Sequence, residues 1–270
     1  MKHIKEFYRF LKHVVESRKL IFMLSRADFK EKYLGSYLGV FWAFFRPSLF
    51  IVVIWFIFSV GFKSKPVDDG TPFILWLLCG FIPWFFFVEG LNQGMNAIVS
   101  NAFFVRKVAF RVSVLPLVKI VSALYIHLIF VAILIFIILM YGYAPTIYWL
   151  QIPYFIFCMT CLLLGLGWIT SSLRVFIKDI GEVIGVIVQF GFWMTPIFWS
   201  LDIVPEQYHS LLELNPMLYV VNGYRNALLH QVWFWEDAYL TIYFLTFSSI
   251  AFAGGALLFK RLRPHFGDVL

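Results

Sequence analysis

Charge is scarce in this sequence. Only 14% of its 270 residues are Asp, Glu, Lys or Arg, compared with roughly 25% in soluble domains. The hydrophobic share is 61%, and the mean hydropathy is +0.84. A soluble fold of this length cannot bury so many apolar side chains. The composition therefore excludes a soluble globular domain and indicates a protein that sits in lipid.

Cysteine and catalytic motifs are scarce as well. Cys79, Cys158 and Cys161 all fall inside apolar stretches, where plain packing explains them better than a redox or metal site. The chain holds no G-x-x-x-x-G-K-S/T phosphate loop, no H-E-x-x-H zinc motif and no glycine-rich dinucleotide motif. We therefore expect no catalytic residue, metal or cofactor on this chain, and no nucleic-acid partner. If the protein does energetic work, the energy must come from a partner subunit or an ion gradient.

Long apolar stretches are what the sequence does have. A helix needs about 20 apolar residues to cross the hydrocarbon core of a bilayer. The apolar residues run all round each helix, whereas the strands of a membrane barrel alternate in blocks of about ten. The prediction is an all-α polytopic membrane protein, with an interfacial segment at 1–37 and one transmembrane domain at 38–270. Six stretches approach the spanning length, at 39–62, 73–98, 115–141, 152–173, 182–200 and 238–259.

The distribution of Lys and Arg predicts the orientation. Nine fall in the first 37 residues, three in 99–114, two in 174–181 and three in the C-terminal tail. The opposite connections hold only Lys63, Lys65 and Arg225. Cytoplasmic loops carry the excess of positive charge, so both termini are expected in the cytoplasm. The basic N-terminal segment has no apolar core with a cleavage site, so we expect no cleaved signal peptide.

Two segments outside the spans are amphipathic. Residues 7–34 interleave apolar side chains with Lys and Arg, which suits a helix lying in the plane of the lipid headgroups. This helix either anchors the first span or forms part of an entry site for an anionic lipid-linked substrate. The outer connection 201–237 is semi-apolar and broken by Pro205, Pro216 and Gly223, which predicts a hairpin of short helices re-entering the membrane.

One acidic residue lies inside a predicted span. Glu89 is followed by Asn92, Gln93 and Asn96 at helical offsets, which gives this helix a polar stripe. An ionisable group within a span is costly and marks a candidate functional site. The alternative is that Glu89 only holds helices together, helped by nearby glycines.

Aromatic side chains are abundant, with 33 Phe, 13 Tyr and 10 Trp. Most are expected to face lipid or fill the core, and part of the excess forms the usual interfacial belts. Aromatic faces that line a channel offer apolar platforms for sugar rings. The candidates for such a channel or gate are Trp84, Phe85, Phe190, Trp193, Phe198, Trp199 and Tyr224.

Five stretches resemble, in the same order, the permease subunits of ATP-binding-cassette exporters for lipid-linked polysaccharide. Each stretch is a weak signal alone, but together they cover nearly the whole chain. One departure is that the proline following the basic pair is delayed to Pro116. The stretches are YLGSYLGVFWAFFRP (33–47), IPWFFFVEGLNQGMNAIVSNAFFVRKVAF (82–110), RVFIKDIGEVIG (174–185), MTPIFW (194–199) and NPMLYVVNGYRNALL (215–229).

The resemblance implies a homodimer around a central channel, with two separate ATPase subunits that bind ATP and Mg²⁺. The substrate would be a glycan on a lipid diphosphate, with O-antigen favoured over capsule or teichoic acid, exported across the bacterial inner membrane. Arg suits phosphate because its guanidinium presents a fork of N–H donors, and Lys suits it because its ammonium is a compact positive charge. The diphosphate candidates are Arg46, Arg106, Lys107, Arg111, Lys32 and Arg26; Leu38 and Gly39 would form the entry loop, and Arg174, Lys178 and Asp179 would couple to the ATPase.

Two other classes of protein stay open at this point. A polytopic transferase acting on lipid-linked sugars would share the aromatic residues and the basic segments, but it should also show paired acids or a metal motif on a membrane-facing loop. A proton-coupled lipid or glycolipid carrier would need more acids or histidines inside the membrane. Here only His127 joins Glu89, and a lone His on an apolar face is more often a packed core residue.

Overall fold

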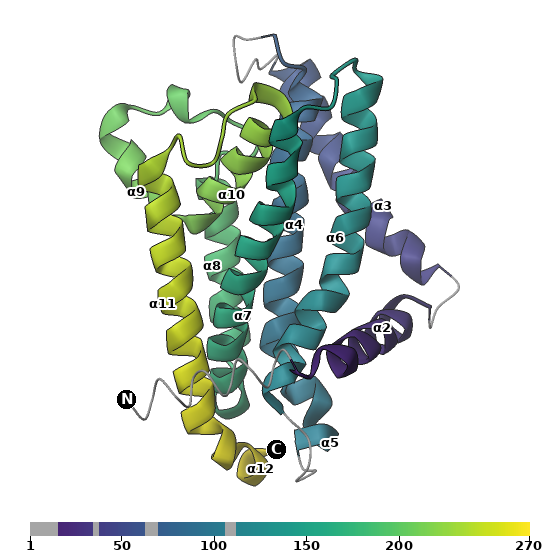
Figure 1. Ribbon diagram of the computed structural model, residues 1–270, viewed down its shortest axis with the longest axis vertical. Helices are drawn as coiled ribbons and strands as arrows, with labels where there is room; N and C mark the ends of the chain where they lie inside the picture. Colours follow the sequence, from purple (N-terminus) through teal and green to yellow (C-terminus); the bar gives the residue numbers. More distant parts are fainter. Residues whose placement is uncertain (1–15, 35–37, 63–69, 106–111) are drawn as a thin grey trace.

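The computed structural model describes residues 16–34, 38–62, 70–105 and 112–270, and every regular element in these ranges is a helix (Figure 1). The long helices are α2 (Arg18–Leu34), α3 (Gly39–Trp55), α4 (Phe73–Asn96), α6 (Leu115–Met140), α7 (Ile152–Phe176), α8 (Ile180–Met194) and α11 (Ala238–Leu262). The short ones include α5 (Ala102–Val105), α9 (His209–Glu213), α10 (Pro216–Arg225) and α12 (Phe266–Val269).

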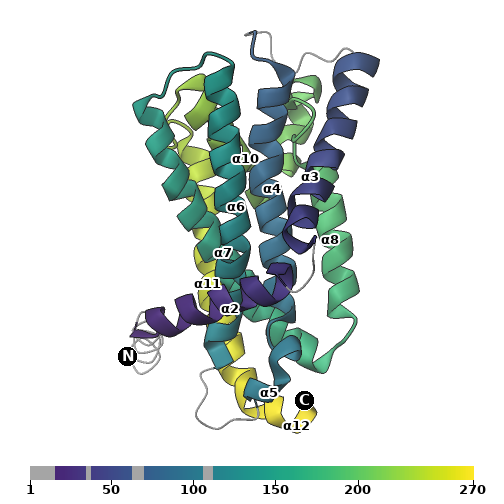
Figure 2. The same ribbon diagram turned by 90° about the vertical axis from the view of Figure 1, so that its right-hand side faces the viewer.

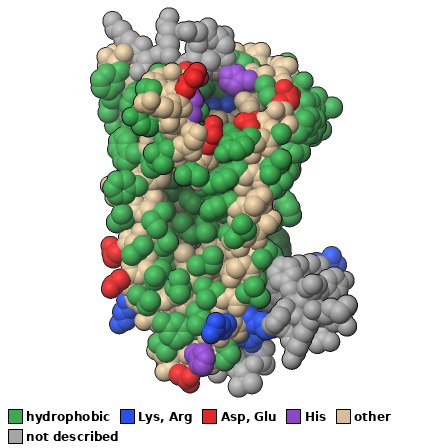
Figure 3. All heavy atoms as spheres, turned by 90° about the vertical axis from the view of Figure 1, so that its left-hand side faces the viewer, with side chains coloured by type: hydrophobic (Ala, Val, Ile, Leu, Met, Phe, Trp, Pro, Cys, Tyr) green, Lys and Arg blue, Asp and Glu red, His purple; other side chains and the backbone are tan. Residues whose placement is uncertain are grey.

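Five helical regions of the described chain are long and apolar enough to cross a membrane: Gly39–Gly61, Phe73–Asn96, Val112–Met140, Ile147–Phe176 and Ala238–Val269. They stand side by side as a bundle (Figures 1 and 2). Large hydrophobic side chains cover much of the outside, and Figure 3 shows them spread over the middle of one face. The chain is therefore an integral membrane protein.

The predicted stretch 182–200 differs from what the structure contains. Its helix, α8, has 15 residues and ends at Met194, so it is shorter than the five spanning regions. Thr195 adopts an extended conformation with φ −87° and ψ 129°. The next residue is Pro196, and a proline disfavours the helical conformation of the residue before it. The helix therefore ends at Met194, two positions before the proline.

The core forms around α4, which packs against α6, α7 and α10 and is buried along most of its length. On the other side of the bundle, α7 and α11 cross very closely. A Cβ atom on Gly255 would lie 2.3 Å from the carbonyl oxygen of Gly165, which no side chain can tolerate. Two glycines thus set the separation of these helices, as small residues do in many membrane proteins.

Helix α2 lies across one end of the bundle, which we refer to as the lower end after its position in Figures 1 and 2. It docks on α6 rather than on the first span alone. Asp28 forms an ion pair with Lys119, and the Ser25 and Tyr125 hydroxyls lie 2.9 Å apart in a hydrogen bond. Ile21 adds an apolar contact with the start of α6. These contacts fix the direction of α2 relative to the bundle.

Helices α9 and α10 lie in the upper half of the structure (Figure 1). Asn215 begins α10: its side-chain oxygen accepts a hydrogen bond from Met217 N, and its amide donates to Thr195 Oγ1 at 2.7 Å. Arg225 at the other end of α10 is buried and donates to the carbonyl oxygen of Ile197 at 2.9 Å. Its guanidinium also lies 3.3 Å from the centre of the Trp76 ring. Both ends of α10 are thus tied to the segment that follows α8.

Candidate functional site

Two cavities adjoin each other between the middle and the lower end of the bundle. The aromatic cavity, of about 540 Å³, lies between α2, α3, α4 and α6 and has an apolar lining that includes Trp42, Phe85, Phe86 and Phe130. The polar cavity, of about 630 Å³, lies below it along α2, α4 and α6 and is lined by charged and amide side chains. Lys32 and Glu89 line both cavities, so they stand on the shared wall.

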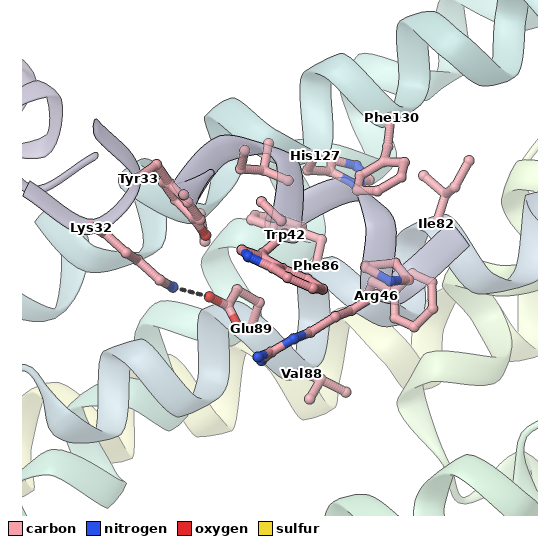
Figure 4. A pocket seen from close by; sticks show the side chains of 16 residues that line it. Lys32, Tyr33, Trp42, Arg46, Ile82, Phe86, Val88, Glu89, His127 and Phe130 are labelled. Atoms are coloured by element: carbon pink, nitrogen blue, oxygen red, sulfur yellow. Dashed lines mark hydrogen bonds and ion pairs between the residues drawn. The ribbon is translucent and has the colours of Figure 1, made fainter. Parts of the chain in front are cut away.

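Lys32 and Glu89 form an ion pair across this wall (Figure 4). Gln93 donates a hydrogen bond of 2.6 Å to the same carboxylate oxygen of Glu89 that Lys32 contacts. The Lys32 ammonium also lies 5.0 Å from the centre of the Tyr33 ring. Burial on its own lowers the pKa of Lys32, but the Glu89 carboxylate outweighs it, so the pKa is raised above its usual value. Lys32 therefore presents a full positive charge to both cavities.

Arg46 comes from α3 and lines the aromatic cavity. Its guanidinium lies 5.7 Å from the centre of the Trp42 ring, one helical turn earlier. In Figure 4 its charged end extends toward the side where Lys32 and Glu89 meet. Within the described part of the chain, Arg46 makes no ion pair with a carboxylate. It is thus a cation available to an anionic ligand.

The polar stripe predicted on α4 lines the polar cavity. Asn92, Gln93 and Asn96 all contribute to its wall, together with the Asp28–Lys119 ion pair. The Asn96 amide donates back to the carbonyl oxygen of Asn92 at 2.8 Å, as side chains one turn apart on a helix can. This face of α4 therefore provides hydrogen-bonding groups next to the two cations.

The far end of the aromatic cavity holds His127, which is only 2% exposed. Its ring stacks on Phe86, with ring centres 4.6 Å apart. Its Nε2 lies 2.9 Å from the hydroxyl of Tyr224 on α10. The cavity is therefore connected through one side chain to α10.

The structure brings together only part of the predicted headgroup set. Lys32 and Arg46 share the aromatic cavity, and Gly39 of the predicted entry loop lines it too, while Leu38 is exposed beside it. Arg26 is exposed on α2 and lines neither cavity. The remaining headgroup candidates, Arg106, Lys107 and Arg111, lie outside the described residues.

The predicted channel aromatics divide into separate groups. Phe85 lines the aromatic cavity, whereas Trp84 points elsewhere and packs on Phe192. Phe190 and Trp193 are 67% and 58% exposed on α8, so they face outward from this single chain. Phe198 and Tyr224 are buried near the upper end, and the Trp199 ring N–H donates to the carbonyl oxygen of Trp193 at 3.3 Å.

The predicted ATPase-coupling residues lie at the turn between α7 and α8, at the lower end (Figure 1). Lys178 and Asp179 are exposed there. Arg174 is partly buried and lies 3.6 Å from the sulfur of Met95, near the end of α4. The turn is therefore accessible from outside the bundle, and the end of α7 that precedes it contacts the helix that carries Glu89.

Sequence reasoning missed several of these partners. His127 reads as an isolated core residue, and only its contact with Tyr224 connects it to the upper end. The Asp28–Lys119 pair went unnoticed because its two residues are distant in the chain. A usable signal was the spacing of Asp28 and Lys32, which places both on one face of an amphipathic helix.

The structure defines the class of protein as a helical membrane protein whose bundle contains a cavity lined by Lys32 and Arg46. The family model described as ABC-2 type transporter matches residues 19–229, which is most of the chain. The chain therefore belongs to the ABC-2 type transporter family. That membership identifies it as a transporter permease and sets aside the transferase and carrier alternatives.

Named relatives agree with the family match. The chain is 25% identical to "O-antigen export system permease protein RfbA" of Klebsiella pneumoniae over 93% of this chain and 95% of that protein. It is 25% identical to the RfbA permease of Myxococcus xanthus, over 80% and 83% of the two chains. It is 28% identical to "Polysialic acid transport protein KpsM" of Escherichia coli, over 71% and 74%. The chain is thus homologous to permeases of polysaccharide export.

Proposed function

We propose that this chain is the membrane subunit of an exporter that moves lipid-diphosphate-linked polysaccharide across the bacterial cytoplasmic membrane. O-antigen-type glycan is the substrate class that the names of the relatives favour, with capsular and teichoic acid polymers as the neighbouring classes. Two copies of the chain form the channel. Two separate ATPase subunits, which hold ATP and Mg²⁺, drive it from the cytoplasmic side.

The lower end faces the cytoplasm in this proposal. The described Lys and Arg residues, Arg225 excepted, lie on α2, in the lower halves of α3 and α6, at the α7–α8 turn and around the end of α11. Positive charge of this kind stays on the cytoplasmic side. Both termini are therefore cytoplasmic, residues 1–37 form the interfacial segment and 38–270 the transmembrane domain.

Helix α8 serves as the sixth span. At 1.5 Å per residue its 15 residues cover about 22 Å, short of the roughly 30 Å of a hydrocarbon core. The segment 195–200 and the helices α9 and α10 continue upward from it and complete the crossing. They form a hairpin that re-enters from the outer side and closes the channel at rest.

The observation that carries the proposal is that Lys32 and Arg46 line one cavity whose remaining wall is mostly aromatic and apolar. An ammonium and a guanidinium together suit a diphosphate, while apolar walls suit the lipid chain next to it. Residues 99–114, with Arg106, Lys107 and Arg111, supply further cations to the same headgroup. Closure of the ATPase dimer then moves the α7–α8 turn and passes the glycan toward the aromatic upper channel.

Export in cells tests this proposal. The chain is expressed in a bacterium that lacks its own permease, and surface polysaccharide is measured for the wild type and for Lys32→Gln/Arg46→Gln. The double variant should lose most export while reaching the membrane at normal levels. Lys30→Gln, a neutralised cation on the same helix, should export normally. Arg106→Gln/Lys107→Gln should also lose export. Normal export by Lys32→Gln/Arg46→Gln would contradict the site.

A further inference from the structure

The Lys32–Glu89 ion pair has features that an ordinary structural ion pair lacks. The side chains of Lys32 and Glu89 are 37% and 43% exposed, whereas those of Lys119 and Asp28 are 20% and 13% exposed. Exposed ion pairs contribute little to folding stability, because water screens them and the long side chains lose freedom. The contact between Lys32 and Glu89 therefore contributes little to the stability of the fold, and it lies on the wall of the proposed headgroup site.

The charges of the aromatic cavity do not balance without a ligand. Its lining contains two cations, Lys32 and Arg46, and one carboxylate, Glu89. Glu89 contacts Lys32 and also accepts a hydrogen bond from Gln93, whereas Arg46 has no carboxylate partner among the described residues. The Glu89 carboxylate thus offsets the charge of one of the two cations that line the cavity, and Arg46 has no such partner among the described residues.

We infer that Glu89 is the internal counter-ion that a phosphate headgroup displaces from Lys32. A phosphate brings more charge and more acceptor oxygens than a carboxylate, so it competes for the ammonium while it also engages Arg46. The displaced Glu89 keeps its hydrogen bond from Gln93 and faces the polar cavity, where water and amide groups solvate it. This inference rests on the proposed function, because it takes the ligand to be an amphiphile with a phosphate headgroup.

The exchange limits how tightly the site holds a phosphate headgroup. A site with two unpaired cations would hold any anionic lipid of the surrounding membrane tightly. With Glu89 in place, each phosphate must replace an existing partner, which weakens binding in the resting state. When the headgroup leaves, Glu89 returns to Lys32 and opposes rebinding. Glu89 therefore limits the affinity of the site for phosphate, because it competes with the phosphate for Lys32.

The test measures equilibrium binding of farnesyl diphosphate to the full-length chain in nanodiscs of uncharged lipid. Glu89→Gln should bind it at least about threefold more tightly than the wild type, a change of the size that an exposed ion pair contributes. Farnesol, which lacks phosphate, should bind both proteins equally. Glu182→Gln removes the same charge on α8 away from both cavities and should change nothing. Glu89→Ala serves as a second variant.

A double-mutant cycle shows whether the effect acts through Lys32. In a Lys32→Gln background, the gain from Glu89→Gln should shrink clearly. An equal gain with and without Lys32 would overturn the exchange, and so would unchanged or weaker binding by Glu89→Gln and Glu89→Ala.

Other outcomes separate this inference from the proposed function. If Lys32→Gln weakens binding but the Glu89 variants do not tighten it, the exchange fails and the headgroup site stands. If farnesyl diphosphate binds none of the proteins, both fail. If inorganic diphosphate binds as tightly as farnesyl diphosphate with the same gain in Glu89→Gln, the exchange stands but the ligand is a free phosphate compound, and the lipid substrate is wrong.

Discussion

Lys32 on α2 pairs with Glu89 on α4, although 57 positions separate them in the chain. The contact joins a helix that lies across the end of the bundle to the helix at its centre. It places a lysine charge beside an arginine from a third helix, in a cavity that is otherwise mostly aromatic and apolar. This arrangement is what turns scattered basic residues into a candidate binding site.

The pKa of Lys32 gives a prediction about pH. The Glu89 carboxylate outweighs the effect of burial, so the folded-state pKa exceeds the ordinary value of 10.5. The pair's contribution to stability is then fully present below the unfolded-state pKa and is lost as pH rises through the folded-state pKa. In Glu89→Gln the carboxylate that raises the pKa of Lys32 is gone, whereas the burial that lowers this pKa remains. Lys32 should therefore lose its proton at lower pH than in the wild type.

Carbon-13 NMR of reductively methylated lysines measures this shift directly. The Lys32 signal should titrate at lower pH in Glu89→Gln than in the wild type. Identical Lys32 titration curves would mean that the ion pair does not control this charge.

The crossing of α7 and α11 gives a second prediction, with its own matched control. A Cβ on Gly255 would lie 2.3 Å from the Gly165 carbonyl oxygen, whereas a Cβ on the adjacent Gly254 meets nothing within 4 Å. Gly255→Ala should therefore destabilise the protein by about 1–3 kcal/mol through overpacking. Gly254→Ala should be neutral or slightly stabilising, because alanine favours a helix over glycine.

Thermal unfolding in detergent compares the two variants. A lower unfolding temperature for Gly255→Ala alone is the expected result. Equal unfolding temperatures for the two variants would show that the helices separate freely at this crossing.

Arg225 gives a third prediction, about closure of the upper end. The Arg225 guanidinium donates a hydrogen bond to the Ile197 carbonyl oxygen and stacks on the Trp76 ring. A lysine ammonium has neither the forked donors nor the planar face that these contacts need. Arg225→Lys should weaken the attachment of α10 by about 1–3 kcal/mol, the cost of leaving buried groups unpaired. Hydrogen exchange in 195–200 and 215–230 should then quicken, while exchange in α6 stays unchanged. Unaltered exchange in these segments would mean that other contacts hold the hairpin.

Much of this fold follows from the sequence, because apolar stretches of spanning length and the placement of Lys and Arg are local properties. Five of the six predicted stretches correspond to helical regions of spanning length, at closely similar positions. The end of α8 was missed because the proline at 196 outweighed the apolar composition around it. Periodicity tells which face of a helix a residue occupies but not which other helix it meets.

The candidate site shows the same division. Lys32, Arg46 and Glu89 were each selected from sequence, for their charge and for their position near a predicted span. Their convergence on one cavity depends on how α2 docks, and that is set by the contacts of Asp28 and Ser25 with α6. Arg225 was counted as a charge of the outer connection, yet it is buried, because two backbone carbonyls and the Trp76 ring replace its water.

The central claim is that the cavity between α2, α3, α4 and α6 receives a lipid-diphosphate headgroup and that its occupancy drives the ATPase partner. The most direct measurement is ATPase activity of the chain purified with its nucleotide-binding partner in nanodiscs, with and without lipid-diphosphate-linked glycan. We predict stimulation by the glycan lipid in the wild type and in Lys30→Gln, and its loss in Lys32→Gln/Arg46→Gln with basal activity retained. Full stimulation of that double variant would contradict the account.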